Sequence, residues 1–483
     1  MSRDDADVVV VGGGNAGFSA AHAAAGRGRK VVLLERGEPD QAGGNSYYTA
    51  GAFRIAHGGL ADVADLLDAD ERLAVTDLPP YPQDAFSADM RTVTGGRADP
   101  ELTAALVADS QDTLRWLHGL GLRFRLMYER QAYRDAAGRQ VFWGGLAVGS
   151  VGGGQGLVEQ HTRAARRSGV EVRYGHRARD LMVEDGRVRG VAGDGWSVRA
   201  GSVVLAAGGF EADSDMRRDW LGPGWERAKV RGTPLNTGDM LRAALAAGAA
   251  RGGDWSSCHS VAWDAGAGDE GDRQLTNRLT RGGYPLGIVV NTGGQRFLDE
   301  GADFRNYTYA KYGARILEQP GGLAFQVFDA ATRPLLRAEE YDAPGTTVVT
   351  AGTLEELAAG MGVDDAALRR TVDAFNAAVD RGVPFDPAVK DGRAARVSPP
   401  KSNWAVPIEA PPFWAFPVTC GITFTFGGLR ADVHGRVLGA AGAPLPGLFV
   451  CGEMLGGLFS GNYPGGTGLT SGAVFGRRAG RLA

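Results

Sequence analysis

The spacing of apolar residues along the chain predicts both strands and helices. Residues 7–11 and 30–34 are short runs rich in Val and Leu, which is typical of strands buried on both faces of a parallel sheet. The 170–205 stretch alternates between apolar and polar residues as strands do, with a turn at Asp185 and Gly186. These segments predict the strands of an α/β core.

Helical spacing is found in three further stretches, residues 100–118, 157–168 and 353–380. Pro100 lies in the first turn of the first stretch and Gly119 marks its end. Thr353 and Glu356 have the spacing of a capping box at the start of the last stretch, which we read as a pair of helices. Residues 383–417 are rich in Pro and aromatic residues and predict an irregular crossing between domains.

The first predicted strand is followed by Gly12, Gly14 and Gly17 in the spacing G-x-G-x-x-G, by an Ala-rich helix, and by a second strand that ends at Glu35. The first glycine permits a tight turn, the second lets backbone N–H groups approach a pyrophosphate, and the third lets helix pack on strand. The phosphate would lie at the helix N-terminus, and Glu35 can accept a hydrogen bond from a ribose hydroxyl. We therefore predict a dinucleotide site, with further contacts from Asn15, Ala16 and Arg36.

Later segments indicate which dinucleotide is bound. A second Gly loop follows Glu35, a strand at 202–209 ends in small residues, and a strand at 447–453 ends in the acid Glu453. NAD dehydrogenases do not need that last acid, whereas FAD proteins use one on the ribityl chain. A helix at 469–478 with a Gly-rich entry would stabilise the negative charge of reduced flavin. We predict FAD in a discontinuous, Rossmann-like α/β domain built from both ends of the chain. The other predicted cofactor contacts are Gly43, Gly44, Asn45, Ser46, Ala207, Gly208, Gly209, Gly238, Asp239, Gly452, Glu453, Gly468, Leu469 and Thr470.

The composition argues against several other classes of protein. The 483 residues include 52 Lys and Arg and 56 Asp and Glu, so no basic excess points to nucleic acid or anionic lipid. Three widely spaced cysteines exclude a disulfide framework, a Cys-based zinc site and an iron–sulfur ligand set, and we expect no metal. No apolar run is long enough to span a bilayer, and a strand begins almost at the N-terminus. We therefore expect a cytoplasmic protein without a signal peptide.

Five motifs carry a resemblance to a known family. They are residues 43–46 (GGNS), 284–291 (YPLGIVVN), 296–312 (RFLDEGADFRNYTYAKY), 420–428 (CGITFTFGG) and 462–472 (NYPGGTGLTSG). Together they resemble the fumarate reductase/succinate dehydrogenase flavoprotein superfamily over nearly the whole chain. Within it, the chain looks most like the tricarballylate dehydrogenase branch, and 3-ketosteroid dehydrogenases are more distant cousins.

The resemblance implies an FAD-binding domain of roughly residues 1–253 and 426–483, with an inserted α+β capping domain of roughly 254–425. In that family a hydride moves between a substrate carbon and flavin N5, while a side chain of the cap handles a proton on the adjacent carbon. Closure of the cap excludes water and aligns the reacting groups.

Family roles transfer to three residues of the predicted cap. Arg305 lies within one residue of the arginine that donates the proton in fumarate reductases. Because an arginine is a poor acid or base at its ordinary pKa, an equally good interpretation makes Arg305 a substrate-carboxylate anchor. Arg281 is the nearest match to a relay arginine, with Arg278 as a rival, and His259 matches a histidine that contacts a substrate carboxylate, with a structural role as its alternative.

Two other positions depart from the fumarate pattern. Phe424 stands where a second substrate histidine is expected, and Tyr463 stands where a second carboxylate-binding arginine is expected, which argues against succinate or fumarate as the physiological substrate. Tyr463 also resembles the tyrosine with which 3-ketosteroid dehydrogenases polarise a substrate carbonyl, although packing over the flavin is an alternative role. Tyr307 and Tyr309 are further candidates for handling the proton.

We therefore interpret the chain as an FAD-dependent dehydrogenase that desaturates a C–C bond next to a carboxylate or carbonyl, in a polycarboxylate or keto acid. Asn45 stands where succinate dehydrogenases carry the flavin-linked histidine, so we expect non-covalent FAD. The electron acceptor would be a separate protein, a quinone or oxygen. Alternatives are an ene-reductase, an oxidase of a specialised pathway and, in another class, a non-catalytic flavin-binding redox subunit. The oligomeric state is not readable from the residues.

Overall fold

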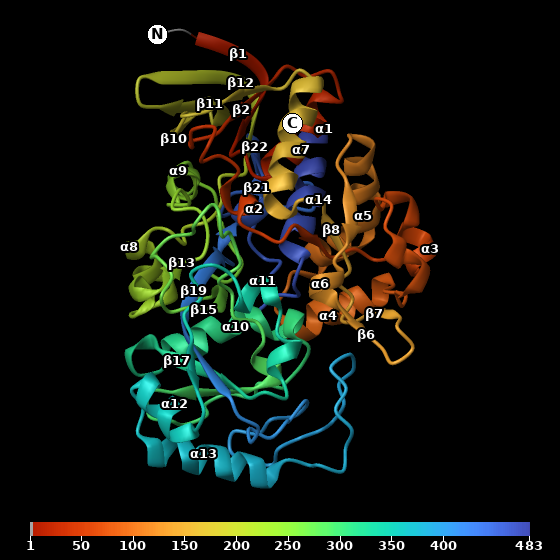
Figure 1. Ribbon diagram of the computed structural model, residues 1–483. Coiled ribbons are helices and arrows are strands. Elements are labelled where there is room, and N and C mark those ends of the chain that lie inside the picture. Colours follow the sequence, from red (N-terminus) through yellow and green to blue (C-terminus); the bar gives the residue numbers. More distant parts are fainter. Residues whose placement is uncertain (1–2) are drawn as a thin grey trace.

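The computed structural model describes residues 3–483 and is organised around two main sheets (Figure 1). The expectation about a signal peptide rests partly on residues 1 and 2, which lie outside the described residues. The strands of the first sheet are β1 (Arg3–Val11), β2 (Val31–Leu34), β9 (Glu171–Arg173), β10 (Ala178–Glu184), β11 (Arg187–Gly193), β12 (Trp196–Leu205), β21 (Arg436–Leu438) and β22 (Pro444–Val450). Their order is β10-β11-β12-β1-β2-β9, and β22 pairs with both β12 and β21.

The centre of this sheet is parallel and fully buried. Val9 of β1 pairs with Val203 of β12 and Val32 of β2, and Leu205 of β12 pairs with Val450 of β22. These side chains are buried on both faces of the sheet, as apolar parallel strands require. The predicted α/β fold is confirmed, and strands from the beginning and the end of the chain share one sheet.

Two helices from opposite ends of the chain lie side by side against this sheet, α1 (Asn15–Ala25) in red and α14 (Thr467–Leu482) in blue in Figure 1. Glycines of α14 allow the close approach. A Cβ atom at Gly480 would lie 2.1 Å from the carbonyl oxygen of Ala20, and one at Gly476 would lie 2.5 Å from that of Ala16. The contact therefore places the N-termini of both helices at the same edge of the sheet.

We expect Gly480→Ala to lower the melting temperature by roughly 1–3 °C, because overpacking a tight contact costs about 1–3 kcal/mol. The obstacle is backbone of α1, which cannot rotate away as a side chain could. Gly119→Ala is the matched control: Gly119 ends α5 (Pro100–Gly119), and no atom outside its own helix and chain neighbours lies within 4 Å of a Cβ built there. Thermal unfolding of both variants tests this, and equal melting temperatures would contradict it.

The second sheet consists of β13 (Lys229–Val230), β15 (Cys258–Asp264), β16 (Ile288–Asn291), β17 (Ala324–Phe328), β18 (Val349–Ala351) and β19 (Phe413–Thr425). β19 is its longest strand and pairs with β13, β15, β17 and β18. Helix α10 (Arg305–Leu317) packs on one face, where Val289 and Val418 lie. Helices α12 (Leu354–Met361) and α13 (Asp365–Ala378) cover the other face, where Ile288 and Val290 lie. Because successive side chains of a strand point to opposite faces, Val289 of β16 faces α10, whereas Ile288 and Val290 face α12 and α13.

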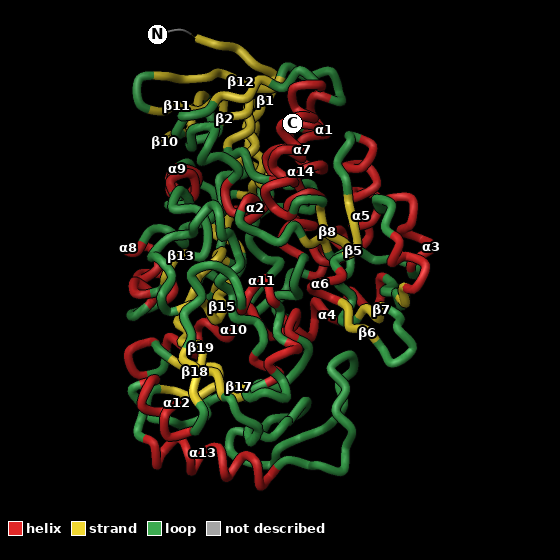
Figure 2. Tube along the Cα trace, in the orientation of Figure 1, coloured by secondary structure: helices red, strands yellow, loops and turns green. Residues whose placement is uncertain are grey.

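Several predicted elements are confirmed with small shifts. The predicted pair of helices is α12 and α13, and Thr353 and Glu356 form the capping box. The helix predicted at 157–168 begins earlier, as α7 (Gly153–Arg167), after Gly152 in a left-handed conformation with φ of +79°. The predicted crossing at 383–417 is irregular as far as residue 412, but β19 already begins at Phe413; this loop is light blue in Figure 1 and green in Figure 2. The predicted domain limits stay a prediction.

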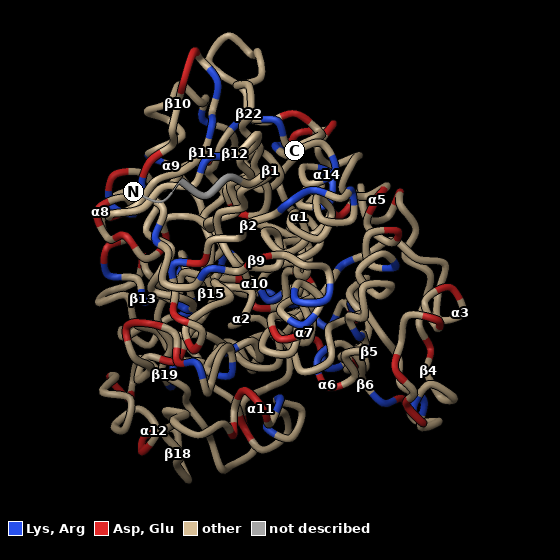
Figure 3. Tube along the Cα trace, turned by 90° about the horizontal axis from the view of Figure 1, so that it is seen from above, with Lys and Arg blue, Asp and Glu red and all other residues tan. Residues whose placement is uncertain are grey.

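Shorter elements complete the chain. They are helices α2 (Gly44–Tyr47), α3 (Leu60–Val63), α4 (Gln83–Val93), α6 (Tyr128–Gln131), α8 (Ser214–Met216), α9 (Asp239–Ala246) and α11 (Ala338–Tyr341), and strands β3 (Ala52–Phe53), β4 (Thr76–Asp77), β5 (Phe124–Leu126), β6 (Ala132–Arg134), β7 (Gln140–Phe142), β8 (Val148–Ser150), β14 (Arg251–Gly252) and β20 (Gly428–Leu429). Lys and Arg are interspersed with Asp and Glu along the chain (Figure 3).

Candidate active site

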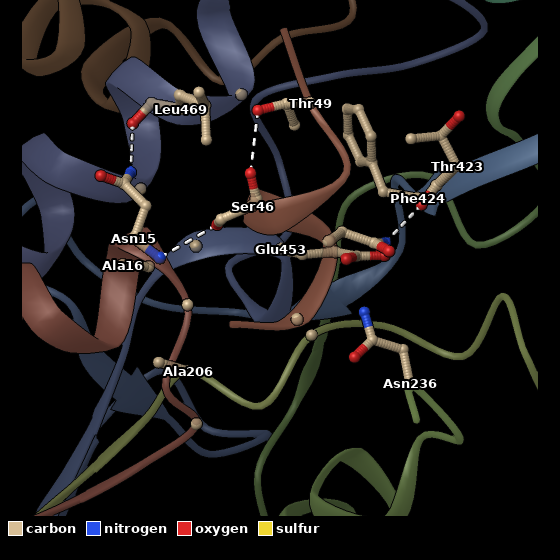
Figure 4. Close-up of a pocket in the computed structure, with 18 of the residues that line it drawn as sticks. Asn15, Ala16, Ser46, Thr49, Ala206, Asn236, Thr423, Phe424, Glu453 and Leu469 are labelled. Atoms are coloured by element: carbon tan, nitrogen blue, oxygen red, sulfur yellow. Dashed lines mark hydrogen bonds between the residues drawn. The ribbon is translucent and has the colours of Figure 1, made fainter. Parts of the chain in front are cut away.

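One cavity extends from the carboxyl ends of β1, β2, β12 and β22 to the C-terminal end of β19 and the start of α10. Ligands of open α/β sheets bind at this edge. Figure 4 shows residues from segments far apart in the sequence around this space, among them Asn15, Ser46, Phe424 and Glu453. The cavity therefore joins the predicted cofactor residues to the predicted substrate residues.

At one end, the first Gly loop touches the neighbouring strand. Gly12 has φ of +110°, and a Cβ atom there would lie 2.2 Å from the carbonyl oxygen of Ala206. The Glu35 carboxylate accepts hydrogen bonds from the N–H groups of Gly13 (3.0 Å) and Gly37 (2.8 Å). Burial raises the pKa of Glu35, whereas these backbone donors oppose the shift. The carboxyl group is thus held by the backbone at the place where a ribose is expected.

The N-terminus of α1 is open to the cavity. Its N-cap residue, Gly14, provides no side-chain cap, so N–H groups of the first turn other than that of Asn15 remain available to a pyrophosphate. Asn15 connects three segments: its backbone N–H donates to Ser46 Oγ (3.0 Å), and its Nδ2 donates to the carbonyl of Leu469 (2.8 Å; Figure 4). The two Gly loops and α14 are therefore fixed relative to one another.

The N-terminus of α14 lies further along the same cavity. Gly466, with φ of +84°, is its N-cap residue, and no side chain caps it. Gly468 and Leu469 of the first turn line the cavity. The positive end of a second helix dipole thus faces the site, as the sequence predicts for the negative charge of reduced flavin. The uncapped helices and the glycine cradle fit FAD.

Two carboxyl groups, that of the buried Glu211 and that of the partly buried Glu453, lie between these helices and β19. Glu453 accepts a hydrogen bond from the Thr425 N–H (2.7 Å; Figure 4), and Glu211 accepts from the Nδ2 atoms of Asn45 and Asn236, both at 2.6 Å. Burial, together with the neighbouring Glu211 carboxylate, raises the pKa of Glu453 well above its ordinary value. Glu211 was not predicted; its only local signal is its place two residues after the small residues 206–209 that follow β12.

Most predicted cofactor residues line the cavity. They are Gly12, Gly14, Asn15, Ala16, Glu35, Arg36, Gly44, Asn45, Ser46, Ala207, Gly208, Gly238, Asp239, Gly452, Glu453, Gly468 and Leu469. The remaining four, Gly17, Gly43, Gly209 and Thr470, are not among the lining residues. A Cβ atom at Gly17 would lie 1.9 Å from the Gly12 carbonyl oxygen, and one at Gly209 would lie 2.1 Å from Glu453 Oε1. Gly17 and Gly209 therefore pack directly behind residues that line the cavity.

Tyr309 of α10 and Tyr463 line the far end of the cavity, and their hydroxyl groups share a hydrogen bond. Burial raises the pKa of both phenols, and for Tyr463 the neighbouring Tyr309 adds to the effect. Both are therefore neutral near pH 7. Because one hydroxyl donates to the other, the second keeps its own proton for another acceptor.

His259 lies behind the cavity and not in its lining, a place that suits the structural role given as the alternative in its prediction. It is buried, is not among the cavity-lining residues, and stacks on Phe424 with ring centroids 5.2 Å apart. Tyr309 and Tyr463 contact its ring edge-on, each at 4.9 Å. Neither ring nitrogen has a hydrogen-bond partner among the described residues, and burial holds its pKa well below the ordinary value. His259 supports the two phenols from behind, so a carboxylate contact is not supported by the structure.

Arg305 lies at the start of α10 in a cluster of charged residues. Oε1 of the buried Glu340 lies 3.1 Å from Arg130, 3.3 Å from Arg305 and 3.4 Å from Arg337. The three guanidinium groups overcome the effect of burial and lower the pKa of Glu340 to about 2. Arg130, Arg305 and Glu340 line the cavity. Arg305 is thus a cavity residue, and its two predicted roles, proton donor and carboxylate anchor, stay predictions.

Two other predicted residues are turned away from the cavity. Arg281 is fully buried and forms an ion pair with Asp264 (2.6 Å), so it lies in the core of the second sheet. Tyr307 donates a hydrogen bond to Asp89 (2.6 Å) and forms a cation–π contact with Arg54 (5.0 Å to the ring centroid). Neither is among the lining residues, so a direct role in a proton relay is not supported for Arg281.

Arg231 is a cavity residue that the sequence did not reveal. It follows β13, and its Nε donates to Thr423 Oγ1 (2.7 Å). Its place beside Tyr309 and Tyr463 depends on the pairing of β13 with β19, between residues almost 200 positions apart. A single arginine between a two-residue strand and a turn carries no recognisable local signal.

We predict that acid denaturation releases all of the flavin. Asn45 stands where a covalent link would require a histidine, and its side chain is fully occupied: Nδ2 donates to Glu211 and to the Thr423 carbonyl (2.6 Å each), and Oδ1 accepts from the Thr233 N–H (2.9 Å). The yellow protein is precipitated with acid, and the absorbance of supernatant and pellet is compared. Colour that stays with the pellet would contradict the prediction.

No helix within residues 3–483 is long and apolar enough to cross a membrane. In the same part of the chain, no group of three or more His, Cys, Asp and Glu residues could hold a metal ion.

Comparisons with known proteins agree with this geometry. The chain is 30% identical, over 491 residues, to a fumarate reductase (cytochrome) of Shewanella frigidimarina, with all of this chain and 77% of that protein covered. It is 29% identical to the 4-oxocyclohexanecarboxylate 2-dehydrogenase of Sinomonas cyclohexanicum, covering 98% of this chain and 91% of that protein. A solved 3-ketosteroid-Δ4-(5α)-dehydrogenase of Rhodococcus jostii RHA1 superposes with a TM-score of 0.73 at 26% identity, covering 100% and 97% of the two chains.

Residues 7–469 match the protein family described as FAD binding domain. This match spans both Gly loops, the second sheet and the start of α14, and it agrees with the predicted superfamily and cofactor. The relatives named above are reductases and dehydrogenases. The chain therefore belongs to the FAD-binding-domain family of flavoproteins and is an FAD-dependent oxidoreductase.

Proposed function

We propose that this enzyme desaturates a C–C bond next to a carboxylate or carbonyl group, in a polycarboxylate or keto acid. The observation that carries the proposal is the single cavity in which Arg305, Tyr309 and Tyr463 share one space with the FAD cradle. Bound FAD supplies a two-electron acceptor at N5 for a hydride from one substrate carbon. The residues of the second sheet and of α10 then have to position the substrate and move a proton from the neighbouring carbon.

The phenol pair is suited to polarise a substrate oxygen. The hydroxyl group that accepts the hydrogen bond within the pair of Tyr309 and Tyr463 keeps one proton for the cavity. Their raised pKa values keep both groups protonated. A fixed donor in a dry site stabilises charge that develops on a carbonyl or carboxylate oxygen. This acidifies the adjacent C–H bond, whose proton must leave when the hydride leaves the other carbon.

Arg305 is suited to hold a substrate carboxylate or to take part in the proton transfer. Its side chain is mostly buried, it pairs with Glu340, and its Nε has no hydrogen-bond partner among the described residues. Phe424 and Phe459 also line the cavity and pack against Tyr463, with ring centroids 5.1 and 5.4 Å away, so they give this region apolar walls. A buried arginine in such surroundings can bind a carboxylate through two hydrogen bonds. Whether the proton passes through Arg305, Tyr309 or Tyr463 is tested by the substitutions described in the Discussion.

The reverse direction, saturation of an activated C=C bond, is the second candidate. The names of the relatives support both directions, because one is a reductase and two are dehydrogenases. One site catalyses both directions, so the electron donor or acceptor decides between them. We expect a separate protein, a quinone or oxygen in that role.

The test is anaerobic bleaching of the flavin. The FAD-loaded enzyme is mixed without oxygen with tricarballylate, with keto acids and with saturated ketones, and the absorbance near 450 nm is followed. We expect bleaching by at least one carboxylate or carbonyl compound. In the reverse experiment, the chemically reduced enzyme is mixed with unsaturated acids and enones, and recovery of colour identifies a reductase. A flavin that neither bleaches nor recovers with any compound would contradict the proposal.

A further inference from the structure

Arg231 is a buried cation without a carboxylate partner. Its side chain lines the cavity and is 9% exposed. Its guanidinium donates to two hydroxyl groups, Thr423 Oγ1 at 2.7 Å and Thr280 Oγ1 at 3.3 Å. Within residues 6–483, no Asp or Glu oxygen lies within 4.0 Å of it. Neutral hydroxyl groups orient this charge but do not balance it.

The other arginines that line the cavity each pair with an acidic residue. Arg36 and Arg177 both pair with Asp239, at 3.6 and 2.7 Å. Arg130 and Arg305 both pair with Glu340, at 3.1 and 3.3 Å. Burial of an unpaired ion is costly, so buried charges in proteins are normally paired or bind a ligand. Arg231 departs from this rule at the substrate end of the cavity.

The groups in contact with Arg231 supply no negative charge. The nearest acidic influence is Glu340, which lies beyond 4.0 Å and is already paired with Arg130, Arg305 and Arg337. Tyr309 and Tyr463 are neutral phenols because burial raises their pKa values, and His259 behind them is neutral because burial lowers its pKa. Trp263 lies against the guanidinium, 6.0 Å from its centre to the ring. The counter-charge must therefore come from whatever occupies the cavity.

The cluster around Glu340 offers a second positive charge. Arg130, Arg305 and Arg337 contact Glu340, and Arg130 also contacts Glu339 at 2.7 Å. Three positive charges against two negative charges leave one positive charge unbalanced. The substrate end of the cavity thus has two cationic centres, Arg231 and this cluster, with the phenol pair in the same space.

We propose that Arg231, oriented by Thr423 and Thr280, binds a second carboxylate of the substrate, so that a polycarboxylate contacts both Arg231 and the cluster of Arg130 and Arg305. This inference rests on the proposed function and specifies its substrate class. It also explains how a dicarboxylate or tricarboxylate can be held although His259 is covered and Phe424 and Tyr463 replace the expected binding groups. The guanidinium has a planar set of donors that matches a carboxylate.

The first test changes the ligand and leaves the protein as it is. Malonate, succinate, glutarate and tricarballylate are titrated into the oxidised FAD-loaded enzyme, with butyrate and the monomethyl esters of the dicarboxylates as single-charge partners. Dissociation constants come from the change in flavin absorbance and from calorimetry. We expect at least one polycarboxylate to bind about tenfold to a hundredfold more tightly than its single-charge partner. Equal affinities throughout, or no binding by any polycarboxylate, would overturn the proposal.

The second test changes Arg231. Arg231→Gln should remove the preference for the polycarboxylate and leave butyrate binding unchanged, whereas Arg231→Lys should keep part of it. Arg227→Gln is the matched control, because Arg227 is exposed four residues earlier in the chain; it should bind like the unchanged enzyme. FAD content and melting temperature establish that each variant is folded.

Two further outcomes separate the possible failures. In the first, Arg231 balances the negative charge of reduced flavin instead of a substrate carboxylate. Arg231→Gln would then lower the flavin midpoint potential without ligand and leave polycarboxylate binding intact. That result would overturn this inference. If ketones or monocarboxylates bleach the flavin as well as polycarboxylates, and Arg231→Gln does not alter this, the proposed function stands and the inference fails. If no compound bleaches or restores the flavin, the proposed function itself fails.

Discussion

Arg305→Ala is expected to lower turnover by about a thousandfold or more while the FAD content stays unchanged. Arg305 lines the substrate end of the cavity and pairs with Glu340 at 3.3 Å. Removing a group that stabilises charge or moves a proton at the reacting carbons typically costs two to four powers of ten in rate, and this group would serve both purposes. The measurement is stopped-flow bleaching with the substrate identified by the anaerobic screen.

The kinetic pattern distinguishes the two roles proposed for Arg305. If it only anchors a carboxylate, the alanine variant should raise KM far more than it lowers kcat, whereas a role in proton transfer should lower kcat at saturating substrate. Arg315→Ala is the control on the same helix: Arg315 is exposed and pairs with Glu318 at 2.7 Å. A fall of less than tenfold in kcat/KM for the Arg305 variant would place this residue outside the site.

The second large effect is expected at the phenol pair. Tyr309→Phe and Tyr463→Phe should each lower turnover by about a hundredfold to a thousandfold, because each removes a hydroxyl group from a hydrogen-bonded pair that delivers one proton to the cavity. The double variant should be little slower than the slower single variant, since residues that act as a unit are not additive. The anaerobic rates of flavin reduction by the unchanged enzyme and by the three variants form a double-mutant cycle.

Tyr312→Phe is the matched control for this cycle. Tyr312 lies on the same helix three residues after Tyr309, but its hydroxyl donates to the carbonyl of Asp299 and it does not line the cavity. Its loss should reduce stability by about 1 kcal/mol and leave the rate unchanged. If neither Tyr309→Phe nor Tyr463→Phe changes the rate, these two tyrosines contribute packing only and no hydrogen bond to the reaction. Independent, multiplicative losses would contradict the idea of a single proton-delivering unit.

The cofactor half of the site could be predicted closely from local patterns. Gly12, Gly14 and Glu35 follow two neighbouring strands, and Glu453 follows a third. The carboxyl ends of parallel strands meet at one edge of the sheet, so residues at the ends of such strands lie together whatever the rest of the chain does. Local spacing also predicted α5, α12 and α13, because their caps and apolar stripes lie within each segment.

The substrate half depended on contacts that no short segment contains. His259 and Arg281 matched family positions, yet the aromatic packing of Phe424, Tyr309 and Tyr463 covers the first, and Asp264 holds the second in the core. Arg231 reaches the cavity because a two-residue strand pairs with β19.

By itself, the sequence determined that this protein is an α/β flavoprotein whose two ends bind FAD, because those signals are carried by spacing within single strands, turns and helices. Only the tertiary structure decided which charged and phenolic groups meet the substrate. Whether an arginine faces a cavity or an aspartate depends on side chains brought together from distant positions, and on the cost of leaving a buried charge unpaired.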